Sequence, residues 1–158
     1  MGQQQLLLVI LVTIIVGIAT VVAINTFGAA ADSANLDAVR QDVAQIAAAA
    51  QGYYMKPAML GGGSRSFVGI TFNDIAFAAS EISGDALTAV NENGRYILPD
   101  VTGDPTDPSV GQTFIITAHP ASDPNYSPGV GGSAATNVGT AEIRANDADA
   151  VTFAEAPE

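Results

Sequence analysis

A run of nineteen residues near the N-terminus, Leu6 to Ile24, is apolar apart from Thr13 and Thr20. As an α-helix rising 1.5 Å per residue this run is about 28 Å long, close to the hydrocarbon thickness of a bilayer. A segment of this kind is stable in lipid or against other apolar surfaces, and not in water. This run therefore restricts the fold more than any other feature of the 158-residue chain.

A cleaved signal peptide and a simple membrane anchor are two ordinary explanations of the run. A signal peptide begins with basic residues and has an apolar stretch of roughly 7 to 15 residues before a small-x-small cleavage site. Here the preceding residues, MGQQQ, carry no Lys or Arg, and the apolar run is longer. A simple anchor stays open, although the basic residues that usually orient an anchor are missing.

The residues after the run predict that the helix continues with a single apolar face. Apolar side chains recur at steps of three and four, the spacing of one stripe on a helix, at Leu36, Val39, Val43, Ile46, Ala50 and Tyr53. Four polar residues are expected on the opposite face: Arg40, Gln41, Asp42 and Gln45. No proline precedes Pro57, so the pattern predicts one helix of some fifty residues.

Small residues mark one side of the apolar run. Thr13, Gly17, Thr20 and Ile24 lie at i, i+4, i+7 and i+11, which places them on one face of the helix. Small residues at such positions let helices approach one another closely. Because the second segment also has a docking stripe, we expect this helix to pack against others.

This arrangement resembles the N-terminal half of type IV pilins and pseudopilins, over about the first 54 residues: MGQQQ, then LLLVILVTIIVGIATVVAI, then an amphipathic extension. The resemblance implies that the apolar half of the helix lies in the inner membrane before assembly and in the filament core afterwards. It also implies that the second half packs on an antiparallel sheet. Leader cleavage and N-terminal methylation belong to the same expectation.

The chain departs from the family at the fifth mature position, where a glutamate usually stands and would pair with a neighbour's N-terminal amine. Gln5 occupies that position if Met1 is the mature start, and Leu7 does if processing follows Gly2. Glutamines can hydrogen-bond between subunits without the cost of burying a carboxylate. We expect filament-core packing from Gln5, Leu6, Thr13, Gly17, Thr20 and Ile24.

We expect an N-terminal helix over residues 1–54, with an apolar half at 1–27 and an amphipathic half at 28–54. Residues 55–158 are expected to form a β-rich head. The expected fold class is therefore α+β. After a loop with apolar side chains at 67–77, four short segments are rich in β-branched or aromatic residues and predict antiparallel strands: 94–99, 111–120, 139–145 and 150–156. The turn Asn146–Asp149 joins the last two. This sheet would cover the helix stripe, with Leu36, Val39, Val43, Ile46 and Tyr53 as the packing residues. Many pilins close a C-terminal loop with a cysteine pair, which this cysteine-free chain lacks.

Charge and motif content argue against several function classes. The formal charge of −11 and five scattered basic residues make nucleic acid an unsuitable partner. The single histidine, His119, stands at a strand end, where histidines are usually at the surface. With no cysteine and no glycine-framed serine, the chain offers no catalytic arrangement, so we do not expect an enzyme.

One loop, DVTGDPTDP, could bind a cation. Asp100, Asp104 and Asp107 lie close together in it, and Ca²⁺ prefers such oxygen ligands. The resemblance adds to this hypothesis, because major pseudopilins carry calcium in a comparable loop, but Asp and Pro also dominate ordinary turns. Asn125-Tyr126-Ser127 fits a short glycosylation motif that arises often by chance.

The leading hypothesis is a structural subunit of an extracellular, type IV pilus-like filament that serves adhesion, motility or surface contact. Its expected partners are identical subunits, the inner membrane before assembly and a pilus assembly machinery. Two alternatives stay open: a type II secretion pseudopilin in a short periplasmic piston, and a monomeric, membrane-anchored binding domain.

Overall fold

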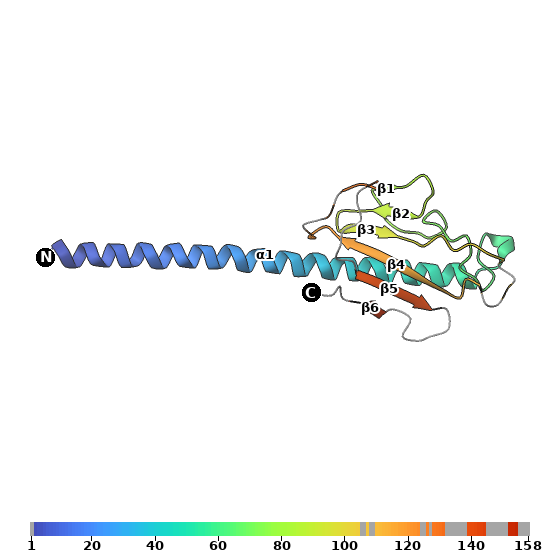
Figure 1. Cartoon of the computed structure of the whole chain (residues 1–158), viewed down its shortest axis with the longest axis horizontal. Helices are drawn as coiled ribbons and strands as arrows, with labels where there is room; N and C mark the ends of the chain where they lie inside the picture. The colour runs from blue at the N-terminus through green and yellow to red at the C-terminus, as the bar shows by residue number, and fades with distance from the viewer. Residues whose placement is uncertain are drawn as a thin grey trace. The chain divides into compact units, whose positions relative to one another are not determined.

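The computed structural model describes residues 2–104, 107, 110–123, 126, 128–131, 139–144 and 152–154. Its first element is one long helix, α1 (Gly2–Met55; Figure 1). The helix ends two residues before Pro57, whose ring cannot continue a helix. The expectation of a single helix of some fifty residues is confirmed.

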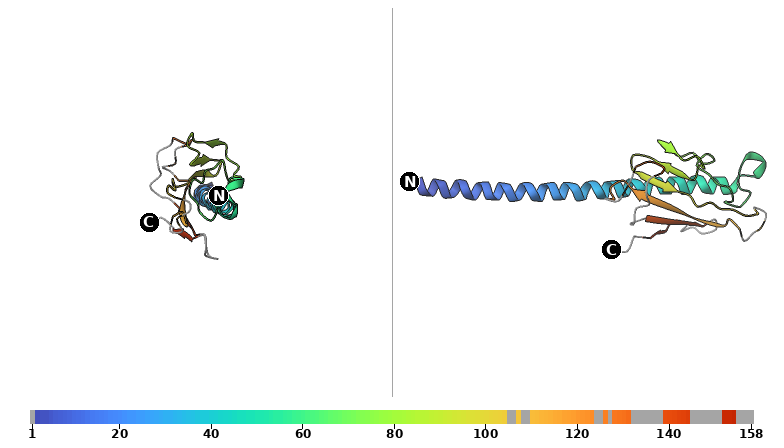
Figure 2. Two further views of the ribbon diagram at one scale, coloured as in Figure 1. Left: turned by 90° about the vertical axis from the view of Figure 1, so that its right-hand side faces the viewer. Right: turned by 45° about the horizontal axis from the view of Figure 1, so that its top comes forward.

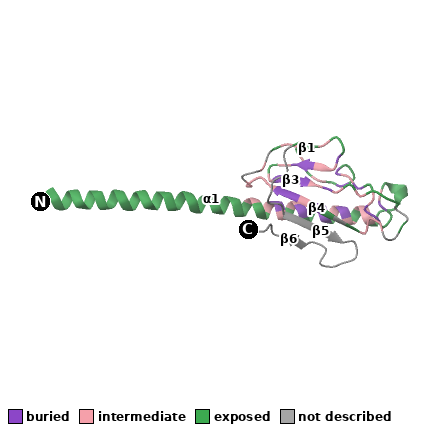
Figure 3. Ribbon diagram, viewed as in Figure 1, coloured by how far each residue is buried: buried purple, intermediate pink, exposed green. Residues whose placement is uncertain are grey.

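The chain divides into two compact units, Met1–Ala34 and Asn35–Glu158, and the division falls within α1. In the first unit every described residue is exposed (Figure 3). By length and composition, α1 is the helix among the described residues that could cross a membrane. The second unit contains the amphipathic end of α1, so that segment belongs with the head.

The second unit contains an antiparallel meander whose strands follow one another in chain order, β1 to β6, among the described residues. The strands are β1 (Glu81–Ile82), β2 (Thr88–Val90), β3 (Gly94–Ile97), β4 (Thr113–Pro120), β5 (Gly139–Arg144) and β6 (Thr152–Ala154). They lie alongside the end of α1, and a 3₁₀ turn, η1 (Ala58–Leu60), follows the helix (Figure 2). The α+β class and the four predicted strands are confirmed, as β3 to β6.

Two strands were missed. β1 has two residues and β2 has three, and neither lies in a longer segment rich in β-branched or aromatic residues, such as the segment 150–156 that predicted β6. The predicted turn Asn146–Asp149 lies outside the described residues.

The core of the second unit forms between α1, the 67–77 loop and the sheet. Val39, Val43 and Ile46 are buried, and Tyr53 packs against the same core. Leu36, one turn earlier, stays 37% exposed. The facing residues come from the loop and from the strands: Phe67, Ile70, Phe72, Ile75, Ala89, Tyr96, Ile116 and Ala118.

Candidate functional site

The largest candidate surface is the apolar half of α1. All fourteen large apolar side chains from Leu6 to Ile24 are exposed, by 46% to 67%. Fully covering a large apolar side chain is worth about 1.5–3 kcal/mol. Because these side chains are little more than half exposed, keeping all fourteen in water costs about 12–24 kcal/mol. Whole domains are stable by only about 5–15 kcal/mol. A surface of this kind suits lipid or contact with other apolar surfaces.

The hydroxyl groups on this half of α1 are already satisfied by the helix itself. Thr13 donates to the carbonyl of Ile10 at 2.8 Å, and Thr20 donates to the carbonyl of Val16 at 2.8 Å. Thr26, and Ser33 in the following half of α1, make equivalent bonds one turn back, at 2.9 and 3.0 Å. A hydroxyl with such a bond can enter an apolar environment at a much lower cost than an unsatisfied one.

The predicted filament-core residues all lie on this exposed surface: Gln5, Leu6, Thr13, Gly17, Thr20 and Ile24. A Cβ atom added at Gly17 would meet nothing within 4 Å. A Cβ atom at Gly17 therefore meets no other described part of the single chain. Packing of these residues against other helices stays a prediction.

A polar cluster fixes α1 to the β2–β3 hairpin. The Oδ2 atom of Asp42 accepts hydrogen bonds from Asn91 and Asn93 at 2.8 Å and from the Tyr96 hydroxyl at 2.7 Å. Asn35, two turns earlier on α1, donates to the carbonyl of Asn93 at 3.0 Å. Partial burial raises the pKa of Asp42, but the three hydrogen bonds outweigh it and lower that pKa below its ordinary value.

The prediction that Asp42 lies opposite the apolar stripe is wrong. At 3.6 residues per turn, Asp42 is rotated by about 60° from Val39, which places it at the border of the stripe. From this border its half-buried carboxylate reaches the hairpin. No side chain within a few residues indicates this role, because the donors lie 49 to 54 positions further along the chain.

A second correction concerns His119, which was expected at the surface. In the β3–β4 register it lies opposite Arg95, and both side chains are 1% exposed. Burial lowers the pKa of His119, and the nearby Arg95 guanidinium lowers it further, whereas Asp123 acts in the opposite direction. The guanidinium Nη1 of Arg95 also donates to the carbonyl of Gly129 at 3.5 Å.

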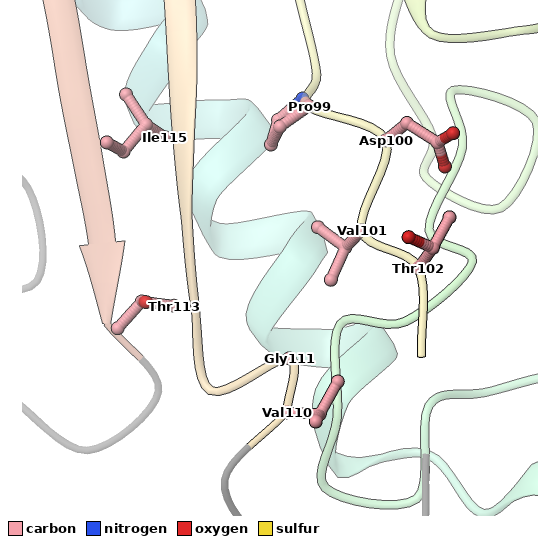
Figure 4. A pocket seen from close by; sticks show the side chains of 8 residues that line it. All are labelled: Pro99, Asp100, Val101, Thr102, Val110, Gly111, Thr113 and Ile115. Atoms are coloured by element: carbon pink, nitrogen blue, oxygen red, sulfur yellow. The ribbon is translucent and has the colours of Figure 1, made fainter. Parts of the chain in front are cut away.

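A groove of about 430 Å³ lies between the segment after β3 and the start of β4 (Figure 4). Val101, Val110 and Ile115 contribute apolar side chains to it, while Asp100 and Thr113 add polar ones. Ile115 is 48% exposed. The groove therefore exposes apolar side chains to solvent.

The groove includes Asp100 but not the other two aspartates of the predicted calcium loop. In the part of the chain that the structure describes, no three Asp, Glu or His residues are grouped so that they could hold a metal ion. Asp104 and Asp107 are linked through the backbone, where the Asp107 amide donates to the Asp104 carbonyl at 3.1 Å. Calcium binding by Asp100, Asp104 and Asp107 stays a prediction, and Asn125 and Ser127 of the glycosylation motif lie outside the described residues.

No family model, curated protein or solved structure matches this chain significantly. Two surfaces lack a cover among the described residues, the apolar half of α1 and the groove beside β4.

Proposed function

We propose that this chain is the structural subunit of a helical, type IV pilus-like filament on the cell surface. In this proposal the apolar halves of the N-terminal helix (residues 1–27) from identical copies pack together in the filament core, and the head forms the outer surface. The observation that carries the proposal is the exposure of all fourteen large apolar side chains from Leu6 to Ile24 on a helix of 54 residues. A filament serves adhesion, motility or surface contact.

Lipid alone would cover the same residues, so the preference for copies needs a separate argument. Moving an apolar helix from lipid into a bundle brings little hydrophobic gain, and close packing must supply the difference. The face with Thr13, Gly17 and Thr20 supports close packing, because its hydroxyls are satisfied and Gly17 has open space beside it. Head-to-tail contacts that do not close into a ring then generate a polymer.

The uncharged start of the helix supports the same proposal. No Asp, Glu, Lys or Arg precedes Asp32, so no charged side chain has to be buried when the helices come together. Burying an unpaired charge costs several kcal/mol. Gln3, Gln4 and Gln5 offer donors and acceptors to neighbouring copies instead.

Microscopy of surface material combined with one substitution tests the proposal. Negative-stain images of sheared cells should show long fibres that contain this chain by mass spectrometry, and Gly17→Leu should abolish them while the protein still inserts into the membrane. Val22→Phe is the matched control, since it also adds four heavy atoms but on the opposite face of the helix. Absence of fibres from wild-type cells, with the chain retained as a monomer in the membrane, would favour an anchored binding domain. Normal fibre yield in Gly17→Leu would exclude close packing on that face.

A further inference from the structure

The last residue of α1 and the turn after it hold three apolar side chains away from the core of the second unit. Met55 is 79% exposed, Met59 is 97% exposed and Leu60 is 66% exposed. We name these three residues the Met59 knob. Within the second unit, exposed large apolar residues are otherwise single, at Leu36, Ile82 and Ile115 among the described residues.

Hydrogen bonds fix the backbone of the knob. The amides of Leu60 and Gly61 donate to the carbonyls of Pro57 and Ala58 at 2.9 and 3.0 Å. The Ser64 hydroxyl accepts from the Ala58 amide at 2.7 Å, and the Ser64 amide donates to the carbonyl of Lys56 at 3.0 Å. A turn that is ordered before binding loses little conformational entropy when it docks. The knob is therefore a preformed contact surface.

The groove beside β4 matches the knob in polarity. It is open to solvent, and Val101, Val110 and Ile115 line it with apolar side chains. The side chains of Met59 and Leu60 would therefore contact apolar atoms there.

The charges around the two surfaces are complementary. Lys56 and Arg65 flank the knob and are exposed, and they are two of only five Lys and Arg residues in a chain of net charge −11. The groove contains Asp100, which is exposed, and Asp104 and Asp107 follow in the same segment. Copies of an acidic chain repel one another in general, so a contact that places the basic residues on the acidic loop fixes one orientation.

We propose that the Met59 knob of one copy docks into the groove beside β4 of a second copy. This inference rests on the proposed function and names a contact between heads in the filament. Because the knob and the groove are different surfaces of one chain, the contact is heterologous and can repeat from copy to copy. It adds to the packing of the N-terminal helices and does not replace it.

Single-cysteine variants test this contact cleanly, since the chain has no native cysteine. Ala58→Cys lies in the knob turn and Thr113→Cys lies in the groove, and both positions are exposed. Cells that express both full-length variants together, treated with a short bismaleimide, should yield a cross-linked dimer that neither variant yields alone. Asn73→Cys, also exposed, replaces Thr113→Cys in the control and should give no dimer with Ala58→Cys. A dimer from Ala58→Cys alone, or equal yields from both pairs, would overturn the proposed contact.

Two further substitutions separate docking from simple proximity. Met59→Ser in the Ala58→Cys chain should lower the dimer yield about tenfold, as expected for an apolar anchor residue. Lys56→Glu should lower the yield by up to about fivefold, the range of one exposed ion pair, and Asp100→Lys in the other chain should restore it. Unchanged yields in both variants would contradict the inference. Fibres of wild-type morphology without the mixed dimer would refute only this contact, whereas monomers without fibres would refute the filament as well.

Discussion

Replacing Asp42 with alanine tests whether the polar cluster holds the head together. The carboxylate accepts three hydrogen bonds of 2.7–2.8 Å, from Asn91, Asn93 and Tyr96. These bonds connect α1 to the β2–β3 hairpin, and no disulfide can do so in a chain without cysteine. Asp42→Ala removes the acceptor and leaves all three donors in place.

The expected loss follows from the burial of each donor. A hydrogen bond to a charged group contributes about 1.5–3 kcal/mol, and a buried donor left without an acceptor costs about 1–3 kcal/mol. Tyr96 is 0% exposed, so its hydroxyl cannot recover a bond to water. Asn91 and Asn93 are half-buried, and water replaces part of what they lose. We therefore expect Asp42→Ala to lower the free energy of unfolding by about 3 kcal/mol.

Urea unfolding of the full-length chain in a non-ionic detergent, followed by near-ultraviolet circular dichroism of its tyrosines, measures this loss. Tyr96→Phe should cost less than Asp42→Ala, because Asp42 keeps two donors. The double variant should lose less stability than the sum of the two single variants, with a coupling energy of about 1 kcal/mol or more.

The wild type should also lose stability as the pH falls below about 3.8, since a carboxylate with a lowered pKa stabilises the folded state only above that range. Asp42→Asn should reduce this acid sensitivity.

Two outcomes would refute this reasoning. One is a loss of less than about 0.5 kcal/mol in Asp42→Ala, the range of ordinary surface substitutions. The other is strict additivity of Asp42→Ala and Tyr96→Phe, which would mean that the two residues act independently.

Two further predictions concern the β3–β4 pair. Burial and Arg95 lower the pKa of His119, so below about pH 6.5 the unfolded chain takes up a proton that the folded chain does not, and the free energy of unfolding should fall as the pH drops. His119→Gln should flatten this dependence of the free energy of unfolding on pH. An unchanged dependence would exclude His119 as its source. A Cβ at Gly94 would overlap the carbonyl oxygen of His119, so Gly94→Ala should cost about 1–3 kcal/mol in thermal unfolding. Gly84→Ala, with nothing within 4 Å, should stay within about 0.5 kcal/mol, and equal losses in both variants would contradict the steric argument.

The sequence predicts those elements of the fold that depend on local patterns. Val39, Val43 and Ile46 repeat at helical spacing, and β3 to β6 carry β-branched or aromatic residues over three to eight positions. Patterns of this kind act within one element. The helix, its stripe and four strands could therefore be predicted without knowledge of the tertiary structure.

Features that depend on distant partners could not be predicted. The environment of Asp42 is set by a hairpin about fifty residues away, and the burial of His119 depends on its register with Arg95. The segment MLGGG indicates only a break in regular structure, since sequence does not tell which apolar residues of a turn face solvent. The solvent exposure of the Met59 knob depends on the three-dimensional structure and could not be predicted from the sequence.

Stability and assembly should respond to different substitutions in this chain. The second unit, Asn35–Glu158, has its own apolar core and its own polar cluster around Asp42, whereas every described residue of the first unit is exposed. Asp42→Ala should therefore unfold the head at lower denaturant concentration, while Gly17→Leu should leave that midpoint unchanged and act on fibre yield alone. If Gly17→Leu lowered the denaturation midpoint of the single chain as much as Asp42→Ala does, the apolar half of α1 would be contributing to the stability of the head. Its exposure could then no longer support a role in binding other copies.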